Sequence, residues 1–384
     1  MKKSHSVINK INKNIVDETG IKNVVKVLKS GFLSKPEGGP YVKLFQNKMS
    51  HWLGKKFCFA TTSGTSSLHA AIASLGLKQN DEVLIPALTY IADASVVIQE
   101  HAKPVFVDVS QEDFNIAPAD VLKKITRNTK ALIVVHMYGQ PARMDELRQI
   151  AKENKLILIE DCAQAAGAKY KNKLIGSFGD ISCFSFYQTK HIVCGEGGLI
   201  ATDNTIYANI LRSILNNGIK RSRLEDYDYD RIGFNYQMTE MQAALGISQL
   251  LRLNQLNRTR RKHAAIYRKI LSETDIFFQK ENKDGYNVYC YLTGLLPKKL
   301  AKKRNLFLSR VLKEKIPIKK QYPLSLTETE IFRKMSDVKL FDTPIAKDIS
   351  KRIFNLYVNP GLEEDDIVHF AKTVLKMYQE IEQS

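Results

Sequence analysis

Asp161 and Lys190 are charged residues whose positions in the sequence suggest a chemical role. The string "LILIED" brings Glu160 and Asp161 to the end of an apolar run. Lys190 follows after one further β-rich string, within "FSFYQTKHIVCGEGG", between aromatic residues and a glycine-rich turn. A solvated lysine needs no such surroundings, whereas a lysine that must lose its proton and form an imine often has them. An aspartate at the end of a strand is common and is weak evidence for a functional site by itself. The lysine that follows it in the sequence makes Asp161 a stronger candidate.

The pair of Lys190 and Asp161 suits pyridoxal phosphate chemistry. In such chemistry a lysine amine forms an imine with the cofactor aldehyde, and a carboxylate keeps the pyridine nitrogen protonated so that the ring accepts electrons. Pairing with the pyridinium cation offsets the cost of burying the carboxylate. We therefore expect Lys190 and Asp161 to be catalytic.

A candidate phosphate site lies in "TTSGTSSLHAAIASLG", which predicts a strand, a tight turn and a helix. Gly64 allows close backbone approach, Thr65 and Ser66 begin the helix, and helix N-termini bind phosphate. Ser185 is a second possible donor. The alternative is a helix cap without a ligand, because Ser and Thr are preferred caps. Tyr90, just past the string "EVLIPA", could lie on a flat heterocycle or be an ordinary core residue.

The elements that must position these residues form an α/β pattern. Short β-rich strings alternate with helical ones from Lys56 to about Thr202, and several are apolar on consecutive positions, as strands covered on both faces are. The β-rich strings are "KFCFATT", "EVLIPA", "PVFVDV", "ALIVVH", "LILIED", "SCFSF" and "GLIAT". This alternation predicts a mostly parallel mixed sheet flanked by helices, with the active site at the carboxyl ends of the strands.

The rest of the chain predicts a second, smaller domain. Helical segments precede the sheet, and a long helical stretch from about Met238 to Leu271 follows it. Beyond that stretch, strings such as "YNVYCYLTGLL" and "KKLAKKRNLFLSRVLKEK" predict strands and a basic helix. We expect a large α/β domain over residues 1–250 and a small C-terminal α+β domain over residues 251–384.

Composition excludes several function classes. The net charge of +18 suits an anionic partner, but no nucleic-acid-binding motif accompanies it, so we expect no nucleic acid. No apolar run is long enough to span a membrane. The five cysteines show no metal-ligand spacing, so we expect no metal site and structural, reduced thiols. The N-terminal "MKKSHSVINKINKN" lacks the apolar stretch of a secretory signal, which predicts a cytoplasmic protein.

The motifs together resemble a known family, the DegT/DnrJ-type aminotransferases. These are fold-type I pyridoxal-phosphate enzymes that aminate nucleotide-linked keto-sugars. The resemblance is clear over residues 20 to 250 and looser beyond. It rests on six strings in the family's order, namely "TTSGTSSLHAA", "IPALTYIADASVV", "VVHMYGQPARMDEL", "IEDCAQAAGA", "SFYQTKHIVCGEGGLI" and "GFNYQMTEMQAALG".

The resemblance implies a role for each site residue. Lys190 would hold the cofactor as an imine and then move protons, and Asp161 would pair with the pyridine nitrogen. Gln164 would bind the phenolic oxygen of the ring and Tyr90 would stack on its face. The phosphate would be held by Gly64, Thr65, Ser66 and Ser185. Asn235 would reach the phosphate from a second subunit, which implies a homodimer with shared sites. The substrates would be glutamate and a keto-sugar nucleotide, for amino-sugar or surface-polysaccharide synthesis.

Two departures from the family pattern bear on the substrate. Gln237 stands where the family commonly has arginine, and Ser325 stands where a histidine is frequent. Amination of a cyclitol, aminobenzoate formation and sugar dehydration stay open as alternatives on the same fold, although dehydrating relatives carry histidine in place of the imine lysine. A binding module without catalysis would be expected to lack the lysine or the aspartate.

Overall fold

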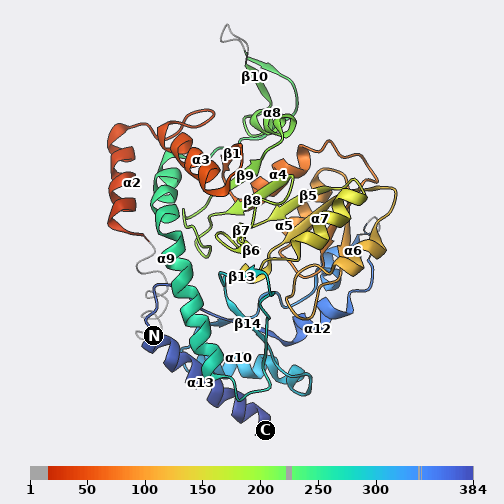
Figure 1. Cartoon of the computed structure of the whole chain (residues 1–384), viewed down its shortest axis with the longest axis vertical. Helices are drawn as coiled ribbons and strands as arrows, with labels where there is room; N and C mark the ends of the chain where they lie inside the picture. Colours follow the sequence, from red (N-terminus) through yellow and green to blue (C-terminus); the bar gives the residue numbers. More distant parts are fainter. Residues whose placement is uncertain (1–15, 222–226, 336–337, 339, 384) are drawn as a thin grey trace.

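A seven-stranded mixed sheet forms the centre of the large part of the molecule (Figure 1). The computed structural model describes residues 16–221, 227–335, 338 and 340–383, so the predicted absence of a secretory signal lies outside the described residues. The strand order is β1-β9-β8-β5-β4-β2-β3, and only β9 runs against its neighbours. The strands are β1 (Phe57–Thr61), β2 (Glu82–Pro86), β3 (Lys103–Val107), β4 (Thr129–Val135), β5 (Ile157–Asp161), β8 (Ile181–Ser185) and β9 (Gly198–Thr202). The seven predicted strings are therefore confirmed as the seven strands.

Apolar side chains on both faces hold this sheet in place. On β5, Leu158 packs into one core cluster and the next residue, Ile159, into the other. On β8, Phe184 and Cys183 divide between the two clusters in the same way. Consecutive apolar residues are required where both faces of a strand are covered. The helices that follow the strands are α4 (Gly64–Ala73), α5 (Ala92–Gln99), α6 (Pro118–Lys124), η1 (Met137–Gly139), α7 (Met144–Glu153) and α8 (Thr205–Ile214).

A long helix, α9 (Glu240–Ile270), joins the large part to the C-terminal part and packs against α2 (Glu18–Ser30) and α3 (Pro40–Leu53). The Glu240 carboxylate accepts the N–H groups of Gly39, Tyr41 and Val42 at 3.0, 2.8 and 3.2 Å. A carboxylate at a helix N-terminus satisfies donors that have no partner within the helix. The predicted domain boundary at residue 250 falls inside α9, and the division stays a prediction.

The C-terminal part is a small α+β unit with its own core cluster. Its antiparallel sheet has the order β12-β14-β16-β15. The elements are β12 (Phe277–Phe278), β14 (Leu292–Leu295), η2 (Lys298–Lys303), α10 (Arg304–Lys313), β15 (Ile318–Lys319), η3 (Leu326–Glu328), α11 (Glu330–Lys334), α12 (Pro344–Arg352), β16 (Ile353–Leu356) and α13 (Glu364–Gln383). The predicted basic helix is shorter than expected, because its first turn is the 3₁₀ helix η2.

Short strands connect the two parts or extend from the large one. Strand β13 (Gly285–Tyr286) pairs with β6 (Lys169–Tyr170), which also pairs with β7 (Lys173–Leu174). Strands β10 (Ile219–Arg221) and β11 (Tyr227–Tyr229) form an antiparallel pair that projects from the top of the molecule in Figure 1. Of the helices in the described ranges, none is both long enough and apolar enough to cross a bilayer.

Candidate active site

Lys190 lies on a tight connection between β8 and β9. The backbone N–H of Phe186 donates to Gly197 and that of Cys194 donates to Phe186, each at 2.8 Å, so the two ends of the loop are closed. Inside it, the Lys190 N–H donates to the Tyr187 carbonyl at 2.9 Å. Gly195 has φ of 84°, a conformation that favours glycine. The glycine-rich string thus folds back a short loop that keeps the half-buried lysine beside the sheet.

Asp161 lies next to this lysine at the carboxyl end of β5. Its side chain is 7% exposed, and one carboxylate oxygen accepts the Ala163 N–H at 2.8 Å. Burial raises the pKa of the Asp161 carboxyl, while the Ala163 N–H and the Lys190 ammonium act in the opposite direction. The structure therefore brings together the two residues that the sequence singled out.

A second buried carboxyl, Asp93, was not predicted. It lies in the first turn of α5 and is fully buried. The Thr89 hydroxyl donates to one of its oxygens at 2.6 Å, while the other oxygen is buried without a hydrogen-bond partner. Burial and the nearby Asp161 raise its pKa well above the ordinary value. An acid inside the apolar string "IADASVV" was the signal that could have identified it.

The predicted phosphate residues meet at one point. A Cβ atom on Gly64 would lie 2.7 Å from the Cβ of Ser185, so the start of α4 touches the end of β8 only because residue 64 is glycine. The N–H groups of Gly64 and Thr65 are at the first turn of α4, where a helix offers no acceptor. Thr65 is exposed, so this end of the helix is accessible.

Ser66 caps the N-terminus of α4. Its N–H donates to the Ser63 hydroxyl at 3.0 Å, and its own hydroxyl accepts the Ser63 N–H at 2.8 Å. This reciprocal pair is a capping box. Since Ser66 is also buried, its side chain stabilises the cradle, and its contact with a phosphate stays a prediction.

Gln164 belongs to a network that reaches the C-terminal part. Its amide oxygen accepts the Tyr138 N–H at 3.0 Å, and its amide nitrogen donates to the Tyr322 hydroxyl at 3.2 Å. The Tyr322 ring lies 6.3 Å from the ring of Tyr90, which is 56% exposed. The exposed ring of Tyr90 is available to stack on a flat ligand. Tyr322 was not predicted, because nothing near it in the sequence points to the site.

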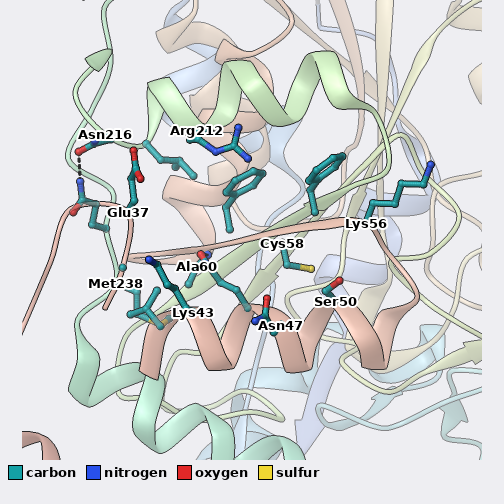
Figure 2. A pocket seen from close by; sticks show the side chains of 17 residues that line it. Glu37, Lys43, Asn47, Ser50, Lys56, Cys58, Ala60, Arg212, Asn216 and Met238 are labelled. Carbon is teal, nitrogen blue, oxygen red and sulfur yellow. Dashed lines mark hydrogen bonds between the residues drawn. The ribbon is translucent and has the colours of Figure 1, made fainter. Parts of the chain in front are cut away.

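Asn235 and Gln237 lie on a segment near a different cavity. Asn235 is exposed and forms an isolated bridge with Asn216, and the Gln237 amide nitrogen donates to Asn216 at 2.5 Å. Gln237 lines a cavity of about 320 Å³ where β1 runs between α3 and α8 (Figure 2). Neither Lys190 nor Asp161 lines this cavity. Among the described residues, Asn235 forms no hydrogen bond to Lys190, Asp161 or Ser185 of its own chain.

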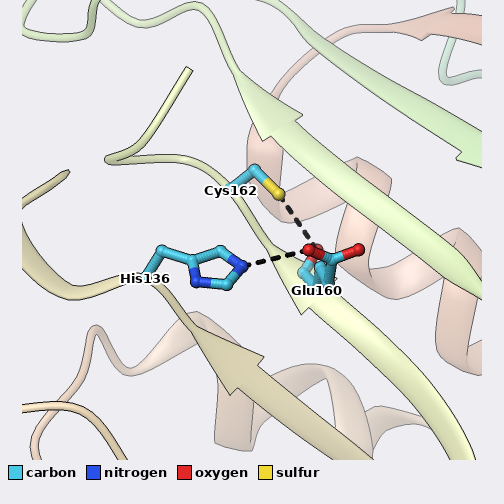
Figure 3. Close-up of side chains that lie close together, drawn as sticks. All are labelled: His136, Glu160 and Cys162. Carbon is cyan, nitrogen blue, oxygen red and sulfur yellow. Dashed lines mark hydrogen bonds and ion pairs between the residues drawn. The ribbon is translucent and has the colours of Figure 1, made fainter. Parts of the chain in front are cut away.

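His136, Glu160 and Cys162 are close enough to suggest a metal site (Figure 3). The Glu160 carboxylate, however, already accepts the N–H groups of Gly176, Phe178 and Gly179 at 2.8, 2.8 and 2.5 Å. The His136 ring uses both nitrogens, since Nδ1 accepts the N–H of Ala142 at 3.1 Å and Nε2 faces Glu160 at 3.2 Å.

These three side chains therefore stabilise the fold through hydrogen bonds within the protein. Burial alone would raise the pKa of the Glu160 carboxyl, but the hydrogen bond from His136 and the backbone N–H groups lower it overall. Burial also raises the pKa of the Cys162 thiol well above its ordinary value, which disfavours the thiolate that a metal prefers. All five cysteines are buried and free of disulfides, as expected of structural thiols.

Two further residues lie where they cannot act on a substrate directly. Ser325 is fully buried, and its hydroxyl donates to the Ala87 carbonyl just past β2 at 3.2 Å. His191, the neighbour of the lysine, is buried and donates through Nε2 to the Val288 carbonyl at 3.2 Å. Burial lowers the pKa of His191 well below its ordinary value, so its ring is neutral.

These residues fit pyridoxal phosphate. The buried Asp161 carboxyl has a raised pKa although Lys190 and, to a lesser extent, His136 favour its charged form, so a pyridinium nitrogen would stabilise its carboxylate further. The first N–H groups of α4 and the Ser185 hydroxyl could hold a phosphate. The exposed Tyr90 ring could cover the cofactor.

Comparisons with known proteins define the class. The model of the DegT/DnrJ/EryC1/StrS aminotransferase family matches residues 14–375. The chain is 33% identical over 349 residues to GDP-perosamine synthase of Escherichia coli O157:H7, covering 89% of this chain and 91% of that protein. It is also 33% identical over 313 residues to a UDP-N-acetyl-3-dehydro-alpha-D-glucosamine 3-aminotransferase of Acidithiobacillus ferrooxidans, covering 81% and 82% of the two proteins.

Comparison with a solved structure supports the same class of protein. DesV of S. venezuelae, in complex with a ketimine intermediate, superposes with a TM-score of 0.86 at 29% identity over 94% of both chains. The chain belongs to the DegT/DnrJ/EryC1/StrS aminotransferase family, and it is an aminotransferase with the fold-type I architecture predicted above.

Proposed function

We propose that this aminotransferase moves an amino group from glutamate to a keto-sugar nucleotide, a 3-keto or 4-keto hexose, with pyridoxal phosphate held by Lys190. The observation that carries the proposal is the buried Asp161 beside Lys190 at the carboxyl edge of the sheet. Relatives named for GDP- and UDP-linked amino sugars support the substrate class and a place in amino-sugar or surface-polysaccharide synthesis.

The residues of the chain divide the chemistry between them. Pyridoxal phosphate, when bound, supplies an electron sink for the carbon that carries the amino group. Asp161 holds the positive charge at the ring nitrogen, in a site where burial has removed competing water. The Nζ of Lys190 would take the proton from the donor carbon as a base and then, as an acid, deliver it to the cofactor.

Binding and orientation fall to the surrounding groups. The N–H groups of Gly64 and Thr65 and the Ser185 hydroxyl bind the phosphate. Gln164 gives one amide N–H to Tyr322 and keeps its second for the phenolic oxygen of the ring. Tyr90 covers the exposed face and excludes water.

A second copy of the chain completes each site. Asn235 is exposed and shares its segment with Ile232, an apolar side chain that is 88% exposed. A solvent-facing isoleucine beside a predicted phosphate ligand favours burial of this segment against a partner. We propose a homodimer in which Asn235 of each copy reaches the phosphate of the other. Five free, buried cysteines suit a reducing cytoplasm.

The cofactor assignment is tested on the purified protein. Reconstituted protein is expected to absorb visible light, to lose that band when glutamate is added, and to carry a pyridoxyl label on residue 190 after borohydride reduction. The Lys190→Ala variant is expected to fold and to lose the band and turnover by at least about 10³-fold. Lys152→Ala, an exposed change on α7, serves as the control. A label on another residue would overturn the assignment.

The substrate is tested separately. Turnover is measured with UDP-, dTDP- and GDP-linked 3-keto and 4-keto sugars, with a cyclitol ketone as the comparison. Faster turnover of the cyclitol ketone would contradict the sugar-nucleotide proposal and leave the cofactor assignment intact.

A further inference from the structure

Asn235 lies in an extended segment between two aromatic residues. The Phe234 N–H donates to the Ile214 carbonyl at the end of α8, at 2.7 Å. The Tyr236 N–H donates to the next carbonyl, of Leu215, at 3.3 Å. Successive side chains of an extended segment point to opposite sides. Phe234 and Tyr236 stack with their ring centroids 5.0 Å apart, so the exposed Asn235 between them points the other way.

The buried His69 of α4 packs against both rings of this segment. The centroid of its ring lies 4.7 Å from that of Phe234 and 5.9 Å from that of Tyr236. Its Nδ1 is hydrogen-bonded to the Tyr236 hydroxyl at 2.8 Å, and its Nε2 lies 2.9 Å from a carboxylate oxygen of Glu100, just after α5. Since a carboxylate only accepts, it favours the tautomer with the proton on Nε2, which leaves Nδ1 to accept the phenol. Burial, and then Glu100, raises the pKa of the Tyr236 hydroxyl, so the phenol keeps its proton for this bond.

Helix α4 therefore touches two different parts of the proposed cofactor site. Its N-terminus is the proposed phosphate site of its own chain. His69, on the same helix, holds the aromatic side of the segment that carries Asn235. The Tyr236 carbonyl also accepts the Thr62 N–H at 3.1 Å, so the segment is bonded to the connection that leads into α4. A change in the packing at His69 is therefore transmitted to Asn235.

We propose that His69 is a positioning residue for the cofactor site of the other subunit, because it fixes the segment that carries Asn235 across the interface. This inference rests on the homodimer proposed above. One helix then serves two sites, since the N-terminus of α4 binds the phosphate of its own chain and His69 sets the reach of Asn235 to the phosphate of the other chain. If His69 only supported the fold around its own phosphate site, its replacement would act on its own chain instead.

Dimers of two differently tagged chains separate these roles. One chain carries Lys190→Ala, so the visible absorbance band reports only the site that holds the intact lysine of the other chain. The Asn235 that serves this reporting site comes from the Lys190→Ala chain. His69→Ala in the Lys190→Ala chain is expected to raise the Kd for pyridoxal phosphate at the reporting site about 10-fold. The same change in the chain with the intact lysine is expected to leave this Kd unchanged, and His369→Ala, an exposed change on α13, should have no effect in either chain.

Tyr236→Phe is the second variant, because it keeps the stacked rings and removes only the hydroxyl that His69 binds. In the Lys190→Ala chain it is expected to raise the same Kd about 3-fold. No change from either chain, an equal change from both, or a change only from the chain with the intact lysine would overturn the inference. An unchanged Kd with Asn235→Ala in the Lys190→Ala chain would overturn the shared site and this inference together, while the band at Lys190 would still support the cofactor assignment.

Discussion

The Nε2 atom of His136 lies 3.2 Å from the carboxylate of Glu160, and both side chains are fully buried. Because Nδ1 accepts the Ala142 N–H, Nε2 carries the proton and donates it to the carboxylate. The same carboxylate receives three N–H groups from the turn that leads into β8. A buried pair that does no chemistry therefore positions the strand that leads to Lys190.

Replacing Glu160 with glutamine is expected to destabilise the fold. A neutral amide turns its NH₂ group toward N–H donors, so the free energy of unfolding should fall by about 3 kcal/mol at pH 7. The folded-state pKa is lowered, so the contribution of Glu160 is present above the ordinary glutamate pKa and is lost as pH falls below it.

Urea unfolding at several pH values checks this expectation. The difference between Glu160→Gln and the unmodified protein should be constant from pH 7 to 5 and shrink below about pH 4. Glu153→Gln, an exposed change on α7, should unfold like the unmodified protein. A constant difference at every pH would show that the charge of Glu160 is not the cause.

Gly64→Ala is expected to weaken cofactor binding more than it weakens the fold. The new Cβ would lie 2.7 Å from the Cβ of Ser185, so the start of α4 must move away from β8. We expect the Kd for pyridoxal phosphate to rise about 10-fold, equal to 1.4 kcal/mol, with a smaller change in Tm. Absorbance titration measures the first and calorimetry the second. Unchanged affinity would mean that the phosphate binds elsewhere.

Asp93→Asn is expected to stabilise the cofactor-free protein at alkaline pH. Burial, then Asp161, raises the folded-state pKa of Asp93, so folding takes up a proton. The contribution of Asp93 to the free energy of unfolding is fully present at pH values below the ordinary carboxyl pKa. It is lost as the pH rises through the raised pKa of the folded state. Asparagine still accepts the Thr89 hydroxyl and does not ionise.

Scanning calorimetry of the Asp93→Asn variant tests this effect. Tm is expected to rise by about 2 °C at pH 8 and by less at pH 5. Asp145→Asn, an exposed change, should show no such trend. An equal loss of Tm at both pH values would mean that Asp93 is ionised and paired.

Mixed dimers test the sharing of sites. Asn235→Ala and Lys190→Ala homodimers should both be impaired, Lys190→Ala completely. If Asn235 acts across the interface, a mixed dimer has one intact site, made of Lys190 from one chain and Asn235 from the other. When equal amounts of the two variants are unfolded and refolded together, about half of the dimers are mixed. About a quarter of all sites are then intact, so the mixture should regain about a quarter of the activity of the unmodified protein. No recovery after mixing would place Asn235 in the site of its own chain.

The sequence predicted the sheet well because its strands are apolar on consecutive positions, as in "ALIVVH" and "LILIED". It also predicted Lys190 and Asp161, because a strand end and a glycine-rich loop leave local patterns. It missed Tyr322, whose partner Gln164 comes from a distant part of the chain. It also missed Asp93, although an acid inside an apolar string was a local sign of it. Ser66 shows the ambiguity at a helix start, since the same serine pattern predicts a phosphate contact and the observed capping box.

The Ser325 hydroxyl bonded to Ala87 bears on the construction of hybrid enzymes. Ser325 and Tyr322 come from the C-terminal part, yet one holds the end of β2 and the other holds Gln164. Grafting the C-terminal third of a relative onto this large part would exchange those two anchors as well. A chimaera meant to change sugar preference must therefore retain this short segment, or bring its matching acceptors from the same parent.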